Sequence, residues 1–456
     1  MVPRPYHVLP GRTADVAILA VAACLSLYLY IRPALRDRPV QRKFVTSGAR
    51  ESSTQAASHP QTVDGLPYAP DVFPGGREVE SEYGTIKVFE WGPEAGEKVL
   101  LMHGIGTPCI ALGDMAKEFV RRGCRVMLFG ESLPPNYLSL YLPTYLPTSL
   151  LSKLALAVFS LHWLPRPVSE TAPPPPPEGW LLMRADFFGR GYSDAPVDLP
   201  YDERLYTSQI LLVLASSGLS WTGSSAFHLV GYSLGGALAA SFAAYHANIL
   251  RSLTLVCPGG LVRSSHVGLL SRLLYSGRLL PNCLTMALVR RRLDPKRGSN
   301  ADVPEGDDAD VDVDFDQVSI SCENPAVKVG HVVRWQLAEN EGFAEAYLST
   351  VRNAPIYGQH DGPWRRLAEQ LSSRRRARAG AETPAGLEAG RICLILAEND
   401  PIVVAEEWIE DARKVLGEDG VVAHVLKGGH EIAISRGRDV ADVAFAAWNG
   451  KDESRL

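Results

Sequence analysis

Apolar runs of strand length alternate with stretches of helical spacing along most of the chain. The runs KVLLMHG (98–104) and CRVMLF (124–129) are mostly continuous apolar sequence, which is typical of strands buried in a parallel sheet. Residues 77–91 predict an antiparallel hairpin before them. The other predicted strands are 227–232, 252–258, 392–400 and 421–428, and the predicted helices are 111–122, 203–217, 234–246, 404–416 and 437–448. This alternation predicts an α/β fold with a mostly parallel sheet.

One long segment interrupts the alternation between two of these strands. Residues 259–390 contain helices and irregular polar stretches, which predict a lid inserted between the two parts of the core, 76–258 and 391–456. Within the lid, the acidic stretch 301–316 and the Arg/Ala/Gly-rich stretch 372–390 are predicted to be loops. The acidic stretch lacks the Gly and the terminal Glu of an EF-hand, which favours a solvated loop over a calcium site.

An uncharged apolar run, VAILAVAACLSLYLYI (16–31), lies near the start of the chain. A helix of this length spans about 24 Å, slightly less than a hydrocarbon core of about 30 Å. Basic residues follow the run closely, and the positive-inside rule then places the rest of the chain in the cytosol. We expect residues 1–31 to be a single-pass membrane anchor and the polar residues 32–75 to be a linker. A cleaved signal peptide is the alternative, but no small-x-small cleavage site follows the run.

Composition excludes some classes of function. A net charge of -5 and a pI near 6.2 give no reason to expect nucleic-acid binding. The seven cysteines are scattered and form no CxxC or Cys/His metal spacing, which argues against a disulfide framework and against structural zinc. The sequence implies no metal and no organic cofactor.

The strongest chemical signal is HLVGYSLGGALAA (228–240), which contains G-x-S-x-G from Gly231 to Gly235. An apolar strand precedes this motif and an Ala-rich helix follows it, which is the context of a nucleophile elbow. Gly231 and Gly235 allow backbones to pass closely, so that Ser233 is held exposed at the start of the helix. The helix dipole and the N–H of Leu234 then favour an oxyanion.

A serine nucleophile needs a base, and the base needs an acid that orients it. Asp400 follows a buried strand and precedes a proline, and His430 lies in a Gly-Gly-His loop after the next strand. A turn carboxylate and a surface histidine are the alternatives for these two residues. His424 lies inside a predicted strand and is a poor rival to His430. The second oxyanion donor is predicted to be the N–H of Ile105, in the His103–Gly104 loop that ends the strand 98–104.

With these motifs the chain resembles the α/β-hydrolase superfamily of serine hydrolases, in the branch with HG after the third strand. The turn Asp186-Phe187-Phe188-Gly189-Arg190-Gly191-Tyr192-Ser193 matches the D-x-x-G-x-G-x-S pattern of that branch. The resemblance covers residues 77–131, 185–260 and 391–450. It implies an eight-stranded sheet, a helical lid and hydrolysis through an acyl-enzyme. A serine at the elbow resembles esterases, lipases and thioesterases rather than the family members that use Asp there.

The chain departs from this pattern at residues 130–185, which separate the strand 124–129 from the turn that begins at Asp186. The segment is rich in Leu, Tyr and Trp and interrupted by prolines. Gly130-Glu131-Ser132 can be encoded by GGTGAGTCN, which contains a GTGAGT splice donor. Arg184-Ala185-Asp186 can be encoded with GCAGAC, which contains an AG splice acceptor. Joining the flanks restores CRVMLFDFFGRGYSD. We therefore interpret the segment as a translated intron; a genuine lid or membrane-dipping insertion is the rival.

These features predict a membrane-anchored hydrolase of a carboxylic ester or thioester with a hydrophobic, lipid-like acyl part. The apolar stretch LVRSSHVGLLSRLLYSGRLL (261–280) motivates the lipid-like preference. A carbon–carbon bond hydrolase and a haloperoxidase-like activity share the same triad and stay open as alternatives. A non-catalytic ligand-binding protein on this fold is the rival from another class.

Overall fold

The structure is a computed structural model. It describes residues 26, 44–46, 72–129, 186–276, 280–295, 315–377 and 384–450. The chain divides into two units, Met1–Lys43 and Phe44–Leu456, and the elements below belong to the second. None of the helices among the described residues has the length and apolar character needed to cross a membrane. The predicted anchor, apart from Ser26, and the whole of 130–185 lie outside the described residues.

The second unit is built on a sheet of eight strands. Their order is β10-β9-β8-β7-β4-β5-β3-β2. All pairs from β10 to β5 are parallel, whereas β3 pairs antiparallel with both β5 and β2. The strands are β2 (Gly76–Val79), β3 (Ile86–Trp91), β4 (Lys98–Met102), β5 (Arg125–Phe129), β7 (Phe227–Tyr232), β8 (Leu250–Val256), β9 (Ile392–Ala397) and β10 (Val421–Leu426). A separate pair, β1 (Phe44–Val45) and β6 (Ala195–Pro196), is antiparallel.

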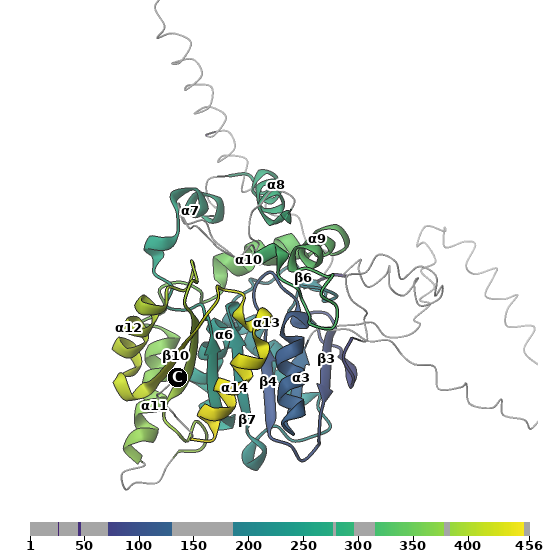
Figure 1. Ribbon diagram of the computed structural model, residues 1–456. Helices are drawn as coiled ribbons and strands as arrows, with labels where there is room; N and C mark the ends of the chain where they lie inside the picture. Colours follow the sequence, from purple (N-terminus) through teal and green to yellow (C-terminus); the bar gives the residue numbers. More distant parts are fainter. Residues whose placement is uncertain are drawn as a thin grey trace, which may run out of the picture. The chain divides into compact units, whose positions relative to one another are not determined.

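Helices cover both faces of the sheet (Figure 1). On one face α3 (Gly113–Arg121) packs against α14 (Gly437–Trp448), with the short α13 (Ile432–Ser435) beside them. On the other face α5, α6, α11 and α12 form a row in which each contacts the next. Their bounds are α5 (Glu203–Ala215), α6 (Leu234–His246), α11 (Pro363–Ala377) and α12 (Ala405–Leu416). The sheet is therefore enclosed between two helical layers, and β4, β7 and β9 are almost completely buried.

Four further helices lie at one end of the sheet, at the top of Figure 1: α7 (Leu269–Tyr275), α8 (Asn282–Leu293), α9 (Val329–Glu339) and α10 (Phe343–Asn353). They belong to the chain segment between β8 and β9. α10 contacts the other three, so these helices form one connected group. α11, from the same segment, instead packs between α6 and α12 beside the sheet.

Candidate active site

Ser233 lies at the joint between β7 and α6 in a backbone conformation that side chains rarely adopt. Its φ is 53° and its ψ is -117°, which costs energy for a residue other than glycine. A Cβ atom on Gly231 would lie 2.3 Å from the carbonyl oxygen of Gly235. A Cβ atom on Gly235 would lie equally close to the carbonyl of Met102. Only glycine fits at both positions, and this tight turn holds Ser233 at the first turn of the helix.

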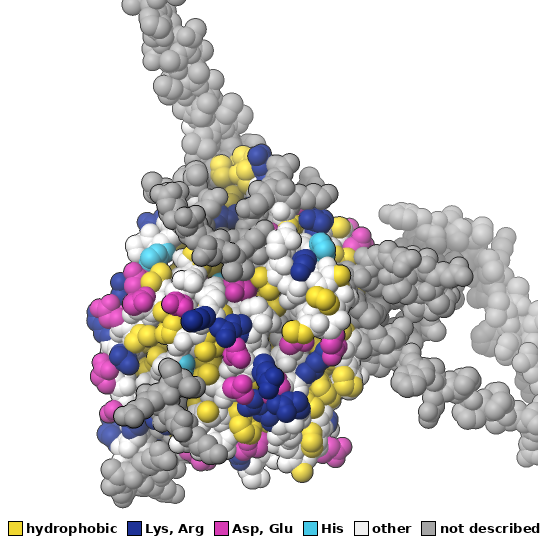
Figure 2. All heavy atoms as spheres, in the orientation of Figure 1, with side chains coloured by type: hydrophobic (Ala, Val, Ile, Leu, Met, Phe, Trp, Pro, Cys, Tyr) yellow, Lys and Arg dark blue, Asp and Glu magenta, His cyan; other side chains and the backbone are white. Residues whose placement is uncertain are grey.

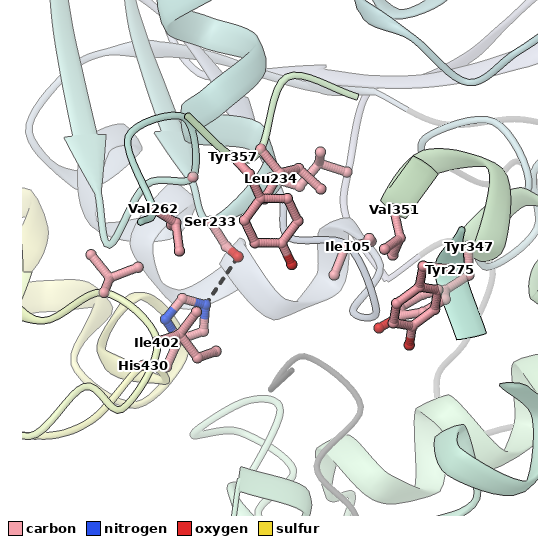
Figure 3. A pocket seen from close by; sticks show the side chains of 13 residues that line it. Ile105, Ser233, Leu234, Val262, Tyr275, Tyr347, Val351, Tyr357, Ile402 and His430 are labelled. Atoms are coloured by element: carbon pink, nitrogen blue, oxygen red, sulfur yellow. Dashed lines mark hydrogen bonds between the residues drawn. The ribbon is translucent and has the colours of Figure 1, made fainter. Parts of the chain in front are cut away.

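The three side chains predicted as a triad form one hydrogen-bonded chain. His430 Nε2 lies 2.9 Å from Ser233 Oγ, the contact drawn in Figure 3, and His430 Nδ1 lies 2.7 Å from Asp400 Oδ2. The second carboxylate oxygen of Asp400 accepts the backbone N–H groups of Ile402 and Val403, each at 2.9 Å. Because a carboxylate only accepts hydrogen bonds, Nδ1 carries the proton, and Nε2 is left to accept from the serine hydroxyl.

The loop after β4 and the start of α6 bring the two predicted oxyanion donors to the same cavity. Ile105 and Leu234 both line the cavity that contains Ser233. The N–H of Gly235 donates to the carbonyl of His103 at 3.0 Å, which ties the loop to the elbow. Leu234 is the first residue of α6, so its N–H is free of the helix's own hydrogen bonds.

His103 sets the orientation of this loop. Its Nε2 accepts the N–H of Phe187 at 2.9 Å, so its Nδ1 carries the proton and donates to the carbonyl of Gly104 at 2.8 Å. Burial lowers the pKa of His103 to about 3, which keeps the ring neutral. The carbonyl of Gly104 and the N–H of Ile105 belong to one trans peptide group and point in opposite directions. The imidazole of His103 therefore fixes the orientation of the Gly104–Ile105 peptide group, and with it the direction of the Ile105 N–H.

The cavity beside Ser233 is largely apolar. It holds about 550 Å³ of space, the open mouth included, and its walls include Val262, Val351 and Ile402. Figure 3 shows the hydroxyl-bearing rings of Tyr275, Tyr347 and Tyr357 beyond Ser233, from different parts of the segment between β8 and β9. Burial raises the pKa of Tyr357 to about 12, and the neighbouring Tyr275 adds to this, so the phenol stays protonated. A cavity of this kind accommodates an apolar group beside the hydroxyl of Ser233.

The family model for the alpha/beta hydrolase fold matches residues 162–436 of this sequence, more than half of the chain. The chain belongs to the α/β-hydrolase family. The match begins inside 130–185 and does not include β2 to β5, although these strands share the sheet with the rest. A comparison with curated proteins found no match.

Solved α/β hydrolases resemble the structure only distantly. Carboxylesterase CesB from Bacillus subtilis is 12% identical with a TM-score of 0.48, and the alignment covers 88% of this chain and 99% of that one. Naproxen esterase from Bacillus subtilis is 12% identical with a TM-score of 0.47, covering 88% and 97%. A membrane phospholipase A, a bacterial virulence factor, is 14% identical with a TM-score of 0.45, covering 97% and 100%.

Two buried polar side chains of this α/β hydrolase hold the loop that carries the predicted oxyanion donor Ile105. Sequence analysis assigned this role to neither of them. Arg190 is fully buried, and its guanidinium donates to the carbonyl of Ile105 at 3.0 Å and to the hydroxyl of Thr350 on α10 at 2.9 Å. Gln336 on α9 donates to the carbonyl of Gly106 at 3.0 Å and accepts the N–H of Gly191 at 2.6 Å. The loop is therefore bound to α9 and α10 as well as to the sheet.

Cys257 is a further residue at the site that sequence analysis did not single out. It follows β8 with a φ of 40°. Its sulfur lies within 4.8 Å of ligand atoms of both Asp400 and His430. Burial raises the pKa of its thiol well above the usual value, and the nearby Asp400 raises it further. A protonated thiol is a poor metal ligand, and Asp400 and His430 already bind each other, so this group fits a hydrogen-bonded triad better than a metal centre.

The rival histidine lies elsewhere. His424 is within β10, opposite Ile395 of β9, and does not line the cavity.

Proposed function

We propose that this α/β hydrolase cleaves a carboxylic ester or thioester through an acyl-enzyme on Ser233. The observation that carries the proposal is the continuous hydrogen-bonded chain from Ser233 through His430 to Asp400, which begins at a strained elbow and opens into an apolar cavity. A serine activated in this way is suited to attack a carbonyl carbon.

In the proposed reaction, Ser233 Oγ attacks the carbonyl carbon while its proton passes to His430 Nε2. Asp400 stabilises the resulting imidazolium. The N–H groups of Ile105 and Leu234 stabilise the tetrahedral oxyanion. When this intermediate collapses, the alcohol or thiol leaves with the proton from His430, and the acyl group stays on Ser233. A water molecule, deprotonated by His430, then releases the acid by the same steps.

We infer a hydrophobic acyl part for the substrate. The support is the aliphatic wall of the cavity, formed by side chains such as Ile105, Val262, Val351 and Ile402. Burial of an acyl chain against this wall contributes about 25 cal/mol to the binding free energy for each Å² of apolar surface removed from water. An acyl chain should therefore be preferred to a charged or strongly hydrated group. In this reading the helices α7 to α10 act as the lid.

Labelling with a fluorophosphonate probe tests the proposed function. The full chain should label, and Ser233→Ala should lose the label completely. Ser241→Ala is the matched control, because Ser241 is a buried serine on the same helix and does not line the cavity; it should label like the wild type. A panel of p-nitrophenyl esters of increasing chain length then measures the acyl preference. A folded wild-type protein that neither labels nor hydrolyses any ester would contradict the proposal.

We also propose that residues 16–31 anchor the chain in a membrane, with the catalytic part in the cytosol. The support is the uncharged run itself and the basic residues that follow it. The full chain should stay in the membrane fraction after alkaline carbonate extraction. In intact cells, added protease should leave the hydrolase part uncleaved. The hydrolase part should be cleaved once the protease has access to the cytosolic face of the membrane. Release by carbonate would refute the anchor, and cleavage from the opposite side would refute the orientation.

A further inference from the structure

We propose that the outer face of α8 docks on an anionic lipid bilayer. This face consists of Cys283, Leu284, Ala287, Leu288 and Arg291, all of them exposed. The proposal goes beyond the hydrolysis reaction, because it concerns a surface that does not include the triad or its cavity.

Two exposed leucines distinguish this face. Leu284 is 46% exposed and Leu288 is 38% exposed. They are four residues apart on one helix and therefore neighbours on its surface. The other large hydrophobic side chains exposed in the described part of the chain are Leu211 on α5, Tyr245 on α6, Val425 on β10, and Leu199 in the loop before α5. α8 is the element among those described that presents two of them together.

The opposite face of α8 is buried, which fixes the orientation of the helix. Thr285, Val289 and Leu293 are buried there, and the helix contacts both α9 and α10. The leucines are thus held outward by packing on the inner side. The apolar side chains of the outer face are therefore in contact with water unless a partner covers them.

The charged side chains of α8 itself are all basic. Within α8 the charged residues are Arg290, Arg291 and Arg292, and the helix contains no Asp or Glu, whereas the whole chain has a net charge of -5. Arg290 and Arg291 are exposed at the C-terminal end of α8, and no acidic side chain of the described residues forms a salt bridge with either. Figure 2 shows hydrophobic and basic side chains side by side at the top of this view.

Apolar side chains flanked by arginines that form no salt bridge among the described residues match the interface of an anionic membrane. The leucines enter the boundary between head groups and acyl chains, and the arginines bind the lipid phosphates. α8 also borders the substrate cavity, because the guanidinium of Arg292 lies 5.8 Å from the ring centre of Tyr275, which lines that cavity. Docking through α8 therefore brings the cavity to the membrane surface, where lipid-like esters are found.

Native cysteines of the chain provide labelling sites for measuring this docking. Cys283 is exposed within the face, and Cys322 is exposed outside it, near Asp114 of α3. The other described cysteines are buried. In one variant Cys24 and Cys322 are changed to Ser, so that a maleimide NBD fluorophore labels Cys283. In the control, Cys24 and Cys283 are changed to Ser, so that the fluorophore labels Cys322.

Both labelled proteins are mixed with vesicles of phosphatidylglycerol and phosphatidylcholine that contain a doxyl-labelled lipid quencher. We expect a blue shift and strong quenching for the label at Cys283 and neither for the label at Cys322. This readout is local to α8, so an N-terminal anchor does not produce it. Pure phosphatidylcholine vesicles should give little quenching. Arg290→Glu with Arg291→Glu should weaken the response to anionic vesicles on the order of tenfold or more.

Three results would overturn the proposal: a label at Cys283 that stays in water, equal quenching at both sites, or equal quenching on neutral and anionic vesicles. A response of the Cys283 label to soluble polyglutamate as large as its response to anionic vesicles would assign the face to an acidic protein instead. The same measurements with Ser233→Ala should be unchanged. A loss of fluorophosphonate labelling in the wild type with intact docking would therefore contradict the proposed function and leave this inference standing.

Discussion

At the scale of single residues, His103 decides how the predicted oxyanion donor is oriented. Its Nδ1–H donates to the carbonyl of Gly104, and the same peptide group carries the N–H of Ile105. We predict that His103→Gln, whose amide reaches the position of Nε2 but not that of Nδ1, lowers kcat roughly tenfold to a thousandfold with little change in KM. The reason is that an oxyanion exists in the transition state and not in the bound ester.

His103→Asn is the matched variant for this prediction. Its amide takes the position of Nδ1 and keeps the hydrogen bond to Gly104, while it loses the acceptor for the N–H of Phe187. We expect it to retain much more of kcat than His103→Gln at similar thermal stability. Steady-state kinetics on one soluble ester measure both variants. Equal losses of kcat in the two variants, or a loss that follows the melting temperature, would show that His103 supports the fold and not the donor.

At the scale of elements, the segments around the elbow were predicted well because their signals are local. The predicted strand 227–232 and helix 234–246 coincide with β7 and α6. The helix 437–448 coincides with α14, and the predicted strand 252–258 agrees with β8 to within two residues. In each case the apolar period and the flanking glycines or polar turns specify the element without reference to the rest of the chain. The number of strands, eight, came from the family resemblance. Their order was not predicted, because periodicity alone does not state which strands are neighbours.

The contacts between elements were not predictable in this way. Gln336 on α9 and Arg190 in the turn after Asp186 are far apart in the sequence, yet both bind carbonyls of the loop 105–106. A buried Arg or Gln in a polar stretch looks like a surface residue until the fold closes around it. The predicted lid, 259–390, also includes α11, which in the structure packs beside α6 and α12 instead of with α7 to α10. The triad residues could be found from sequence motifs. The residues that hold the neighbouring loop could be found only from the tertiary contacts.

At the scale of the whole molecule, residues 130–185 raise the largest question about the chain. Both of their flanks are fixed in the core. Phe129 ends β5 opposite Val88, and Asp186 is fully buried and accepts the backbone N–H of Cys109. A long segment between two fixed points must lose loop-closure entropy on folding, on the order of 3 kcal/mol for a loop of this length. A chain in which Phe129 is followed directly by Asp186 avoids this cost and matches the family pattern.

We therefore predict that transcripts join the two flanks, and that the joined protein unfolds at a higher temperature than the full chain. Long-read sequencing of transcripts across Phe129 and Asp186 and thermal denaturation of both proteins measure these two outcomes. Deletion of 301–314, a second segment outside the described residues, is the control for the general effect of shortening a loop. If transcripts always contain the segment, and its removal lowers both stability and labelling of Ser233, then the segment is a genuine part of the enzyme.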